Sequence, residues 1–389
     1  MRITDVQDLT VPLEGGISNA LVSFAEHTVS LVAVTTDAVR GGRPVVGYAF
    51  DSIGRFAQGG ILRDRMLPRL RAADPASLLS ADGARFDPAA VLATIMRNEK
   101  PGGHGDRAAA AGAIELAFWD INAKLADEPA CDTIARSQGR PWLSGSTAVY
   151  AAGGYYYPPG GGRLLTDELR AYEDLGFDAF KMKIGGAPLA ADMARINEAL
   201  AVAGRGDRLA VDANGRFGLN DALAYAAAIG PLGLRWYEEV GDPLDFRLNA
   251  EIAARYTGPI ATGENLFSVP DTVNLVRFGG MRPGKDVFQM DPGLAYGLTE
   301  YIRMLEVLEG AGFDRAQCFP HGGHLINLHI AVGLGLGGCE AYPGVFQPFG
   351  GYPAGCVLEG GRVHTTDAPG FGLEQKPELR PFLAALTPR

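Results

Sequence analysis

The sequence has little cysteine. Its 389 residues include four cysteines, Cys131, Cys318, Cys339 and Cys356, and no two of them form a C-x-x-C pair. Wide spacing argues against both a disulfide framework and a zinc cluster. We therefore expect four free thiols.

The chain also lacks an excess of positive charge. It contains 35 Lys and Arg against 45 Asp and Glu, which gives a net charge of −10. Because the basic residues are dispersed and form no stripe, the sequence predicts no nucleic-acid partner. If the substrate is an anion, it must be attracted by local Lys, Arg or metal charge rather than by the overall field.

Long apolar runs are missing as well. Hydrophobic residues make up 47% of the chain and charged residues 21%, and the apolar runs are too short to span a membrane. The N-terminus carries an acidic residue within its first seven positions and has no apolar stretch with a cleavage site. We expect a soluble, cytoplasmic protein without a membrane partner.

A βα unit repeats from about residue 147 onward. Each unit is a short apolar run ending in polar or glycine residues, followed by a helical stretch rich in Ala, Leu and Glu. The strands are expected to end within eight segments: 147–154, 179–186, 209–215, 235–240, 259–265, 287–293, 317–323 and 339–345. Eight units at this spacing predict an α/β fold with a closed (β/α) barrel, a modified TIM barrel.

The region before the repeat has a different pattern. Alternating segments at 28–37 and 43–51 predict strands, and a glycine-rich stretch and helical residues follow them. The turn-rich tail is expected to pack back on this region. We predict an α+β capping domain over 1–125, completed by about 362–389, and a barrel over 126–361.

Three carboxylates stand where consecutive barrel strands are expected to end. They are Asp212 in VDANG, Glu238 in WYEEV and Glu264 in TGEN. Taken singly, each is more often a solvated strand end or a helix cap. Strands three, four and five are neighbours, however, so their C-terminal ends can bring three oxygens around one cation. An oxygen-only ligand set favours Mg²⁺ over zinc.

Two further residues near these acids are expected to play lesser parts. Asn214 lies two residues beyond Asp212, which places it on the same face if the strand continues, where it could hold a ligand or a water. Glu239 should point away from Glu238 by the same alternation, so we assign it a supporting or structural role.

Strand two carries Lys181 and Lys183 on one face. In isolation, such a K-x-K pair would be read as two lysines reaching solvent. Beside the acid trio and its cation, we instead expect the two like charges to lower the ammonium pKa. Lys183 then becomes a base near neutral pH, and Lys181 stays a positive stabiliser.

Strand seven is expected to end at His321 in FPHGGH, and strand six at Asp291 in QMDPG. Adjacent strands would let the Asp291 carboxylate fix the tautomer of the imidazole and raise its pKa. His321 would then be a proton donor across the site from Lys183. A lone histidine is more often a packed or capping residue, so this hypothesis depends on Asp291.

Candidate substrate contacts come from three loops. Lys100, in NEKPGGHG (98–105), either lies over the barrel mouth or belongs to a flexible turn. Arg55, in SIGRF (52–56), is a second cation. Tyr155 or Tyr156, in GGYYYPP (153–159), would narrow the pocket, although aromatic stacking at a domain junction would explain them equally. The GLGLGG string at 333–338 follows a helical run, so we read it as a turn and not as a dinucleotide site.

These residues give the sequence a resemblance to the mandelate racemase branch of the enolase superfamily over nearly its whole length. The resemblance is carried by K-M-K at 181–183, D-A-N at 212–214, E-E at 238–239, G-E-N at 263–265, Asp291 and His321. It implies that Asp212, Glu238 and Glu264 bind Mg²⁺. It also implies that Lys183 is one acid/base and the Asp291–His321 dyad the other.

Within this branch the sequence is most similar to the D-tartrate dehydratases. The similar segments include YAAGGYYYP, FKMKIGGAP, DANGRF, WYEEVGDPLD and PHGGH. Val240 replaces the proline that follows the paired glutamates elsewhere in the branch, and the D-tartrate dehydratases share this departure. The segment FQMDPGLAYG differs from what the resemblance leads us to expect.

The resemblance implies a Mg²⁺-dependent carbon–oxygen lyase, a hydro-lyase acting on a small hydroxy diacid. Another acid-sugar dehydratase or a racemase is the alternative, because bases on both faces of the substrate can also return a proton. A sugar-acid binding protein without activity is a third reading. We further expect a small anionic substrate and a homo-oligomer.

Overall fold

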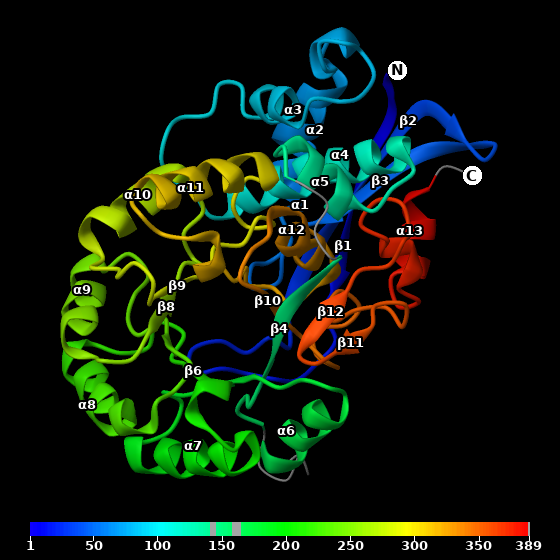
Figure 1. Ribbon diagram of the computed structural model, residues 1–389. Helices are drawn as coiled ribbons and strands as arrows, with labels where there is room; N and C mark the ends of the chain where they lie inside the picture. Colours follow the sequence, from blue (N-terminus) through cyan, green and yellow to red (C-terminus); the bar gives the residue numbers. More distant parts are fainter. Residues whose placement is uncertain (141–144, 158–164, 388–389) are drawn as a thin grey trace.

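The computed structural model describes residues 1–140, 145–157 and 165–387. Pro158 and Pro159, which end the predicted GGYYYPP segment, lie outside these residues. Figure 1 shows two parts, a sheet with helices formed mainly by the N-terminal third and a ring of strands and helices formed by the later residues.

The N-terminal part is built on a three-stranded antiparallel sheet of order β1-β2-β3. Its strands are β1 (Ile3–Pro12), β2 (Thr28–Arg40) and β3 (Arg43–Phe50). The two strands predicted from alternation are β2 and β3. Strand β1 was not predicted and pairs with β2 along almost its full length.

Helices cover this sheet. The helices that follow the sheet in the sequence are α1 (Gly59–Ile61), α2 (Leu67–Arg71), α3 (Pro88–Ile95) and α4 (Asp106–Ala126). Helices α1, α2 and α4 contact the strands, and α3 packs on α2 and α4. Helix α4 packs on β2 and β3 and also touches α5 (Ala130–Ser137) and α11 (Leu298–Gly310). Every residue from Ala108 to Ala123 is buried. A helix buried all round lies at the centre of a structure, and α4 lies between the sheet and the barrel.

The barrel strands run parallel to one another in the predicted order. The strands are β4 (Ser146–Gly153), β5 (Phe180–Lys183), β6 (Leu209–Asp212), β7 (Tyr237–Glu238), β8 (Ile260–Thr262), β9 (Val287–Phe288) and β10 (Cys339–Ala341). Strand β10 pairs with β4, which brings the last strand beside the first.

The seventh predicted strand is not a regular strand. Its segment makes one isolated parallel bridge, between Phe288 and Cys318, and its backbone continues with Phe319 N donating to Phe288 O at 2.8 Å. Pro320 has no N–H for a ladder, and Gly322 turns the chain at φ +112°. Glu340 N donates to Pro320 O at 3.2 Å, so the segment still joins β9 to β10.

Helices surround the barrel strands in an arc (Figure 1). Besides α11, the barrel helices are α6 (Leu165–Asp174), α7 (Leu189–Ala203), α8 (Leu219–Ile229), α9 (Phe246–Arg255), α10 (Val269–Phe278) and α12 (Leu325–Leu334). The GLGLGG string ends α12 with Gly335 in the left-handed conformation and leads into β10, which agrees with the predicted turn.

A packed cluster fills one end of the barrel interior. Tyr150 and Trp236 meet edge to face with ring centroids 5.0 Å apart, and Phe319 lies against both rings. Such filling is usual for an eight-unit barrel, whose interior is a core and not a pore. The charged residues of the predicted site lie beyond this cluster, at the C-terminal ends of the strands.

The C-terminal residues contact both parts. Strands β11 (Leu358–Glu359) and β12 (Arg362–His364) form a hairpin that pairs with β4, and α13 (Arg380–Leu386) packs against β1 and β2. The predicted domain limits stay a prediction. Among the described residues, no helix combines the length and the apolar character needed to cross a membrane.

Candidate active site

A cavity of about 550 Å³ lies at the C-terminal ends of the barrel strands. Residues from both parts of the molecule line it, among them Phe24 and Arg55 from the N-terminal part and Lys183, Glu264 and His321 from the barrel. Cavities at this end of a barrel are where enzymes of this architecture carry out their chemistry. The cavity is therefore the candidate active site.

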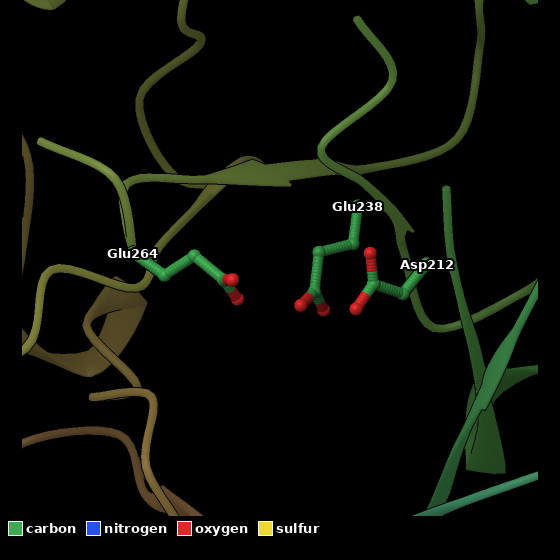
Figure 2. A group of neighbouring side chains, drawn as sticks. All are labelled: Asp212, Glu238 and Glu264. Atoms are coloured by element: carbon green, nitrogen blue, oxygen red, sulfur yellow. The ribbon is translucent and has the colours of Figure 1, made fainter. Parts of the chain in front are cut away.

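The three predicted carboxylates converge at one place. Asp212 and Glu238 are the last residues of β6 and β7 and are register partners, and Glu264 follows β8 by two residues. One oxygen from each lies within 4.8 Å of the other two. Figure 2 shows Glu264 reaching toward the carboxylates of Glu238 and Asp212 from the opposite side.

The donor set of this group fits a hard divalent cation. All three side chains offer only oxygen, and Asp212 and Glu238 are fully buried. Within the described part of the chain, Glu264 Oε2 and Asn214 Oδ1 are buried and accept no hydrogen bond. Buried oxygens normally have a partner, and Mg²⁺ prefers an all-oxygen site.

Asn214 and Glu239 both leave the extended strand conformation. Their φ angles are +48° and +38°, in the left-handed region. Asn214 nevertheless lines the cavity beside Asp212, as expected, whereas the face expected for Glu239 is wrong. Asn214 still supports Asp212, since its backbone N–H donates to Oδ1 at 2.8 Å. Glu239 lines the cavity instead of pointing away from it, and it accepts a hydrogen bond from Asn265.

Lys181 is buried among carboxylates. Its Nζ lies 2.5 Å from Glu238 Oε1, 2.7 Å from Glu340 Oε1 and 3.4 Å from Asp212 Oδ2. Burial alone would lower the pKa of Lys181, but the neighbouring acids outweigh it and raise the pKa well above its ordinary value. Lys181 is thus held as a cation, as the sequence predicts.

Lys183 donates to Asp212 Oδ2 at 2.5 Å. Burial acts to lower its pKa, but the attraction of Asp212 and the other acids is larger, so the protein side chains alone raise the pKa. The lowering was expected beside a bound cation and stays a prediction. Lys181 does lower the pKa of its neighbour, but Asp212, Glu264 and Glu238 together exceed that single like charge.

Glu340 is a site residue that the sequence analysis missed. It lies in β10, is buried, pairs with Lys181, and accepts the N–H of Gly322 at 3.0 Å. Burial acts to raise its pKa, but Lys181 and His321 lower it to about 2. Its place in the last predicted strand was a usable signal, because the other acids were found by the same rule.

His321 and Asp291 form the predicted dyad. His321 Nδ1 lies 3.1 Å from Asp291 Oδ2, and Asp291 is fixed by Gly293 N at 2.8 Å and Asn327 Nδ2 at 2.9 Å. Burial acts to lower the pKa of His321, but Glu264, Asp291 and Glu340 together raise it to about 9. The predicted upward shift is confirmed, with Glu264 as the largest contributor.

Tyr342 was also missed by sequence reasoning. Its hydroxyl lies 3.0 Å from His321 Nε2, the ring nitrogen that does not face Asp291. Tyr342 is buried and lines the cavity, so it holds the second edge of the imidazole. No local sequence pattern marks such a contact, because the two residues are joined only by the packing of neighbouring barrel segments.

The candidate substrate contacts divide into two groups. Arg55 and Tyr155 line the cavity. Lys100 is exposed and is not among the lining residues, so a role in substrate binding stays a prediction. Tyr156 lies behind the wall, where its hydroxyl donates to Asp192 Oδ1 at 2.7 Å. Of the two neighbouring tyrosines, the structure brings only Tyr155 to the cavity.

Comparison with known proteins identifies the family. Residues 164–379, more than half of the chain, match the family described as Enolase C-terminal domain-like. The chain belongs to the enolase superfamily. The matched residues include β5 to β10, and therefore the trio, both lysines and the dyad.

The individual relatives have a low sequence identity with this member of the superfamily. It is 26% identical to an arabinonate dehydratase of Saccharolobus solfataricus, over 60% of this chain and 60% of that protein. The structure is similar to that of L-talarate/galactarate dehydratase from Salmonella typhimurium with Mg and L-lyxarohydroxamate, with 21% identity, a TM-score of 0.73 and coverage of 94% and 88%. A racemase from Streptomyces coelicolor with bound magnesium gives 22% identity, a TM-score of 0.74 and coverage of 95% and 96%.

Proposed function

We propose that this protein dehydrates a small hydroxy diacid, and that the diacid is D-tartrate, converted to oxaloacetate. The observation that carries the proposal is the convergence of three carboxylates between a buried lysine pair and a histidine–aspartate dyad. The dehydratases among the relatives support the reaction class. The resemblance of several sequence segments to D-tartrate dehydratases supports the substrate.

Removal of an α-proton from a carboxylate needs strong stabilisation of the resulting enediolate. Asp212, Glu238 and Glu264 would hold the Mg²⁺, and the solved relatives with magnesium support this choice of ion. When bound, Mg²⁺ supplies positive charge that stabilises the enediolate and offsets the acids that raise the pKa of Lys183. Lys183 takes the proton from the α carbon as general base.

The dyad serves the second half of the reaction. Asp291 accepts from Nδ1 of His321, which leaves Nε2 as the nitrogen that gives its proton to the departing β-hydroxyl. Tyr342 at Nε2 keeps that edge of the ring oriented until the substrate is present. Loss of one water from tartrate leaves the enol of oxaloacetate, which becomes the oxo acid.

The alternative function is dehydration of another acid sugar, or racemisation. Lys183 and His321 belong to the second and seventh barrel segments and line the same cavity, so both faces of a substrate have a proton carrier. Such a pair can return a proton as well as expel hydroxide. Cytoplasmic residence and a homo-oligomeric state stay predictions.

A panel of acid sugars tests the proposal. With Mg²⁺ present, release of oxo acid is followed for D-tartrate, L-tartrate, meso-tartrate and galactarate at equal enzyme concentration. We expect kcat/KM for D-tartrate to be at least about 100-fold higher, because inversion at either carbon displaces a reacting group from its catalyst. Comparable turnover of galactarate, or no oxo acid from D-tartrate, would contradict the proposed substrate.

A further inference from the structure

One wall of the cavity is formed around the ring of Phe267, which follows β8. The guanidinium of Arg55 lies 4.9 Å from the centre of this ring. A Cβ on Gly105 would lie 3.9 Å from the same ring, so the residue next to His104 is close by. Arg55 and His104 both line the cavity and belong to two separate loops of the N-terminal part.

Arg55 brings an uncompensated positive charge to this wall. Its Nη2 donates to Asn265 Oδ1 at 2.7 Å, and Asn265 in turn donates to Glu239. Asn265 is neutral, and no ion pair joins Arg55 to a carboxylate in the part of the chain that the structure describes. The remaining guanidinium donors are therefore available to an anion in the cavity.

The hydrogen bonds around His104 suit one placement of its ring proton. Arg107 Nε donates to the hydroxyl of Tyr296 at 3.0 Å, and the same hydroxyl lies 3.0 Å from His104 Nδ1. Arginine has no acceptor, so the tyrosine proton is free to go to Nδ1. The imidazole then carries its own proton on Nε2, away from Tyr296. His104 lines the cavity and Tyr296 does not, so we infer that this edge faces the cavity.

The supports of His104 are themselves fixed. Arg107 Nη1 donates to Lys100 O at 2.9 Å, and its Nη2 donates to Gly102 O. Tyr296 is held at φ +58° after β9 and is only 6% exposed. A non-glycine residue in this conformation is rare and persists where the surroundings determine it. Tyr296 lies in the LAYG segment, where the sequence departs from its resemblance.

We propose that Arg55 and His104 bind the second carboxylate of a diacid substrate, with Tyr296 and Arg107 as positioning residues. This rests on the proposed function, in which the first carboxylate lies at the acid trio. A charged fork and an N–H donor on one wall suit two carboxylate oxygens. A sugar acid with a terminal alcohol would leave the guanidinium without a counter-charge. The wall therefore makes the protein prefer diacids over monoacids of equal length.

The test compares two four-carbon acids of the same configuration, D-tartrate and the monoacid whose distal carbon is a primary alcohol. Selectivity is the ratio of kcat/KM for the diacid to that for the monoacid, with saturating Mg²⁺. We expect Arg55→Leu and His104→Leu each to lower this ratio at least about 30-fold, the usual scale for removing one partner of a buried charged hydrogen bond. The monoacid should be affected much less.

Two conservative variants separate positioning from packing. His104→Gln keeps an N–H donor and should restore part of the selectivity that His104→Leu loses. Tyr296→Phe removes the hydroxyl that orients the ring and should lower selectivity by less than His104→Leu. Arg97→Ala is the matched control, since it removes an exposed cation from the neighbouring helix end outside the cavity. Its selectivity should equal that of the wild type, and the melting temperature is recorded for each variant.

If Arg55→Leu and His104→Leu lowered turnover of the diacid and the monoacid equally, the assignment would be overturned. It would also be overturned if Lys100→Ala lost activity on the diacid alone while His104→Leu was unaffected. A wild type inactive on both acids would refute the proposed dehydration instead. Calorimetric binding of both acids by Lys183→Ala, with and without His104→Leu, then decides the inference alone. Preferential diacid binding that His104→Leu abolishes supports it, and equal binding of the two acids refutes it.

Discussion

Asp212 contacts both lysines at the barrel mouth. It accepts from Lys183 Nζ, lies 3.4 Å from Lys181 Nζ, and is register partner to Glu238. Burial acts to raise its pKa, but the two ammonium groups lower the pKa far below its ordinary value. It therefore stays an anion, as a ligand for Mg²⁺ must.

Asp212→Asn should leave the fold intact and weaken Mg²⁺ binding. The amide has nearly the same shape but one negative charge fewer, and the loss should exceed the roughly 100-fold that removal of an outer support costs a metal site. Calorimetric titration with Mg²⁺ measures it, and circular dichroism checks the fold. Full turnover by metal-free wild-type protein in excess chelator would contradict a metal requirement altogether.

Lys183 and His321 should fail in different ways. His321→Asn leaves the general base in place, so this variant should still exchange the substrate α-proton with deuterated solvent while forming no oxo acid. Lys183→Ala should do neither, because it lacks the base that removes the proton. Proton NMR in D₂O follows the exchange. Robust exchange by Lys183→Ala would reverse the two assignments.

At the scale of single elements, helix α12 contains a histidine without a catalytic role. His329 is fully buried, its Nδ1 accepts from Cys131 N at 3.4 Å, and Phe371 lies edge-on to it. Burial lowers its pKa from 6.5 to about 3. The folded-state pKa is below the unfolded one, so the unfolded chain binds the proton first. The contribution of neutral His329 to the stability of the fold is fully present above pH 6.5 and is lost as the pH falls toward 3.

The loss of stability caused by His329→Gln should therefore be smaller in acid than at pH 7.5. Whatever the variant costs at pH 7.5, the difference from the wild type should shrink by about 2 kcal/mol at pH 5, because only the wild-type unfolded state gains a proton there. The exact folded-state pKa matters little while it lies below 5. Urea unfolding at both pH values measures the difference. If the difference in stability were the same at both pH values, His329 would take up its proton as readily in the folded protein as in the unfolded chain.

The sequence predicted the elements that carry chemistry better than the direction of their side chains. Asp212, Glu238 and Glu264 were found because strand ends are marked by apolar runs that stop abruptly. Glu239 was misplaced, because its left-handed φ ends the alternation that predicts a face. Position in a sequence also cannot reveal contacts that depend on packing.

Three such contacts show this limit. Tyr155 and Tyr156 are neighbours, but only the completed wall determines which one meets the cavity. Tyr342 follows the eighth barrel segment and contacts His321 at the end of the seventh. His104 depends on Tyr296, 192 positions away. The (β/α) repeat was readable from periodicity, whereas these pairs required the folded chain.

For the whole molecule, the C-terminal tail joins the barrel to the N-terminal part at Gly370. Phe371 N donates to Asp120 Oδ1 at 2.7 Å, and Asp120 Oδ2 accepts from Tyr48 N at 2.8 Å. Asp120 thus joins helix α4, strand β3 and the tail. Gly370 has φ +80°, and a Cβ there would lie 2.2 Å from Asp120 Oδ1.

Gly370→Ala should destabilise the protein by more than its backbone conformation explains. An alanine at positive φ costs about 1–2 kcal/mol, and the clash with Asp120 adds to it. Gly204→Ala is the matched control, since Gly204 has φ +77° and nothing within 4 Å of the added Cβ. Thermal unfolding of both variants measures the difference. Equal losses would show that the tail tolerates displacement from Asp120.

The link between His104 and Tyr296 has a consequence for chimeric proteins. The loop that carries His104 belongs to the N-terminal part, but the hydroxyl that orients its ring follows strand β9 of the barrel. A capping domain transplanted onto the barrel of a relative would keep His104 and lose the orientation of its ring. Exchange of domains should therefore transfer diacid preference only when the LAYG segment moves with the cap.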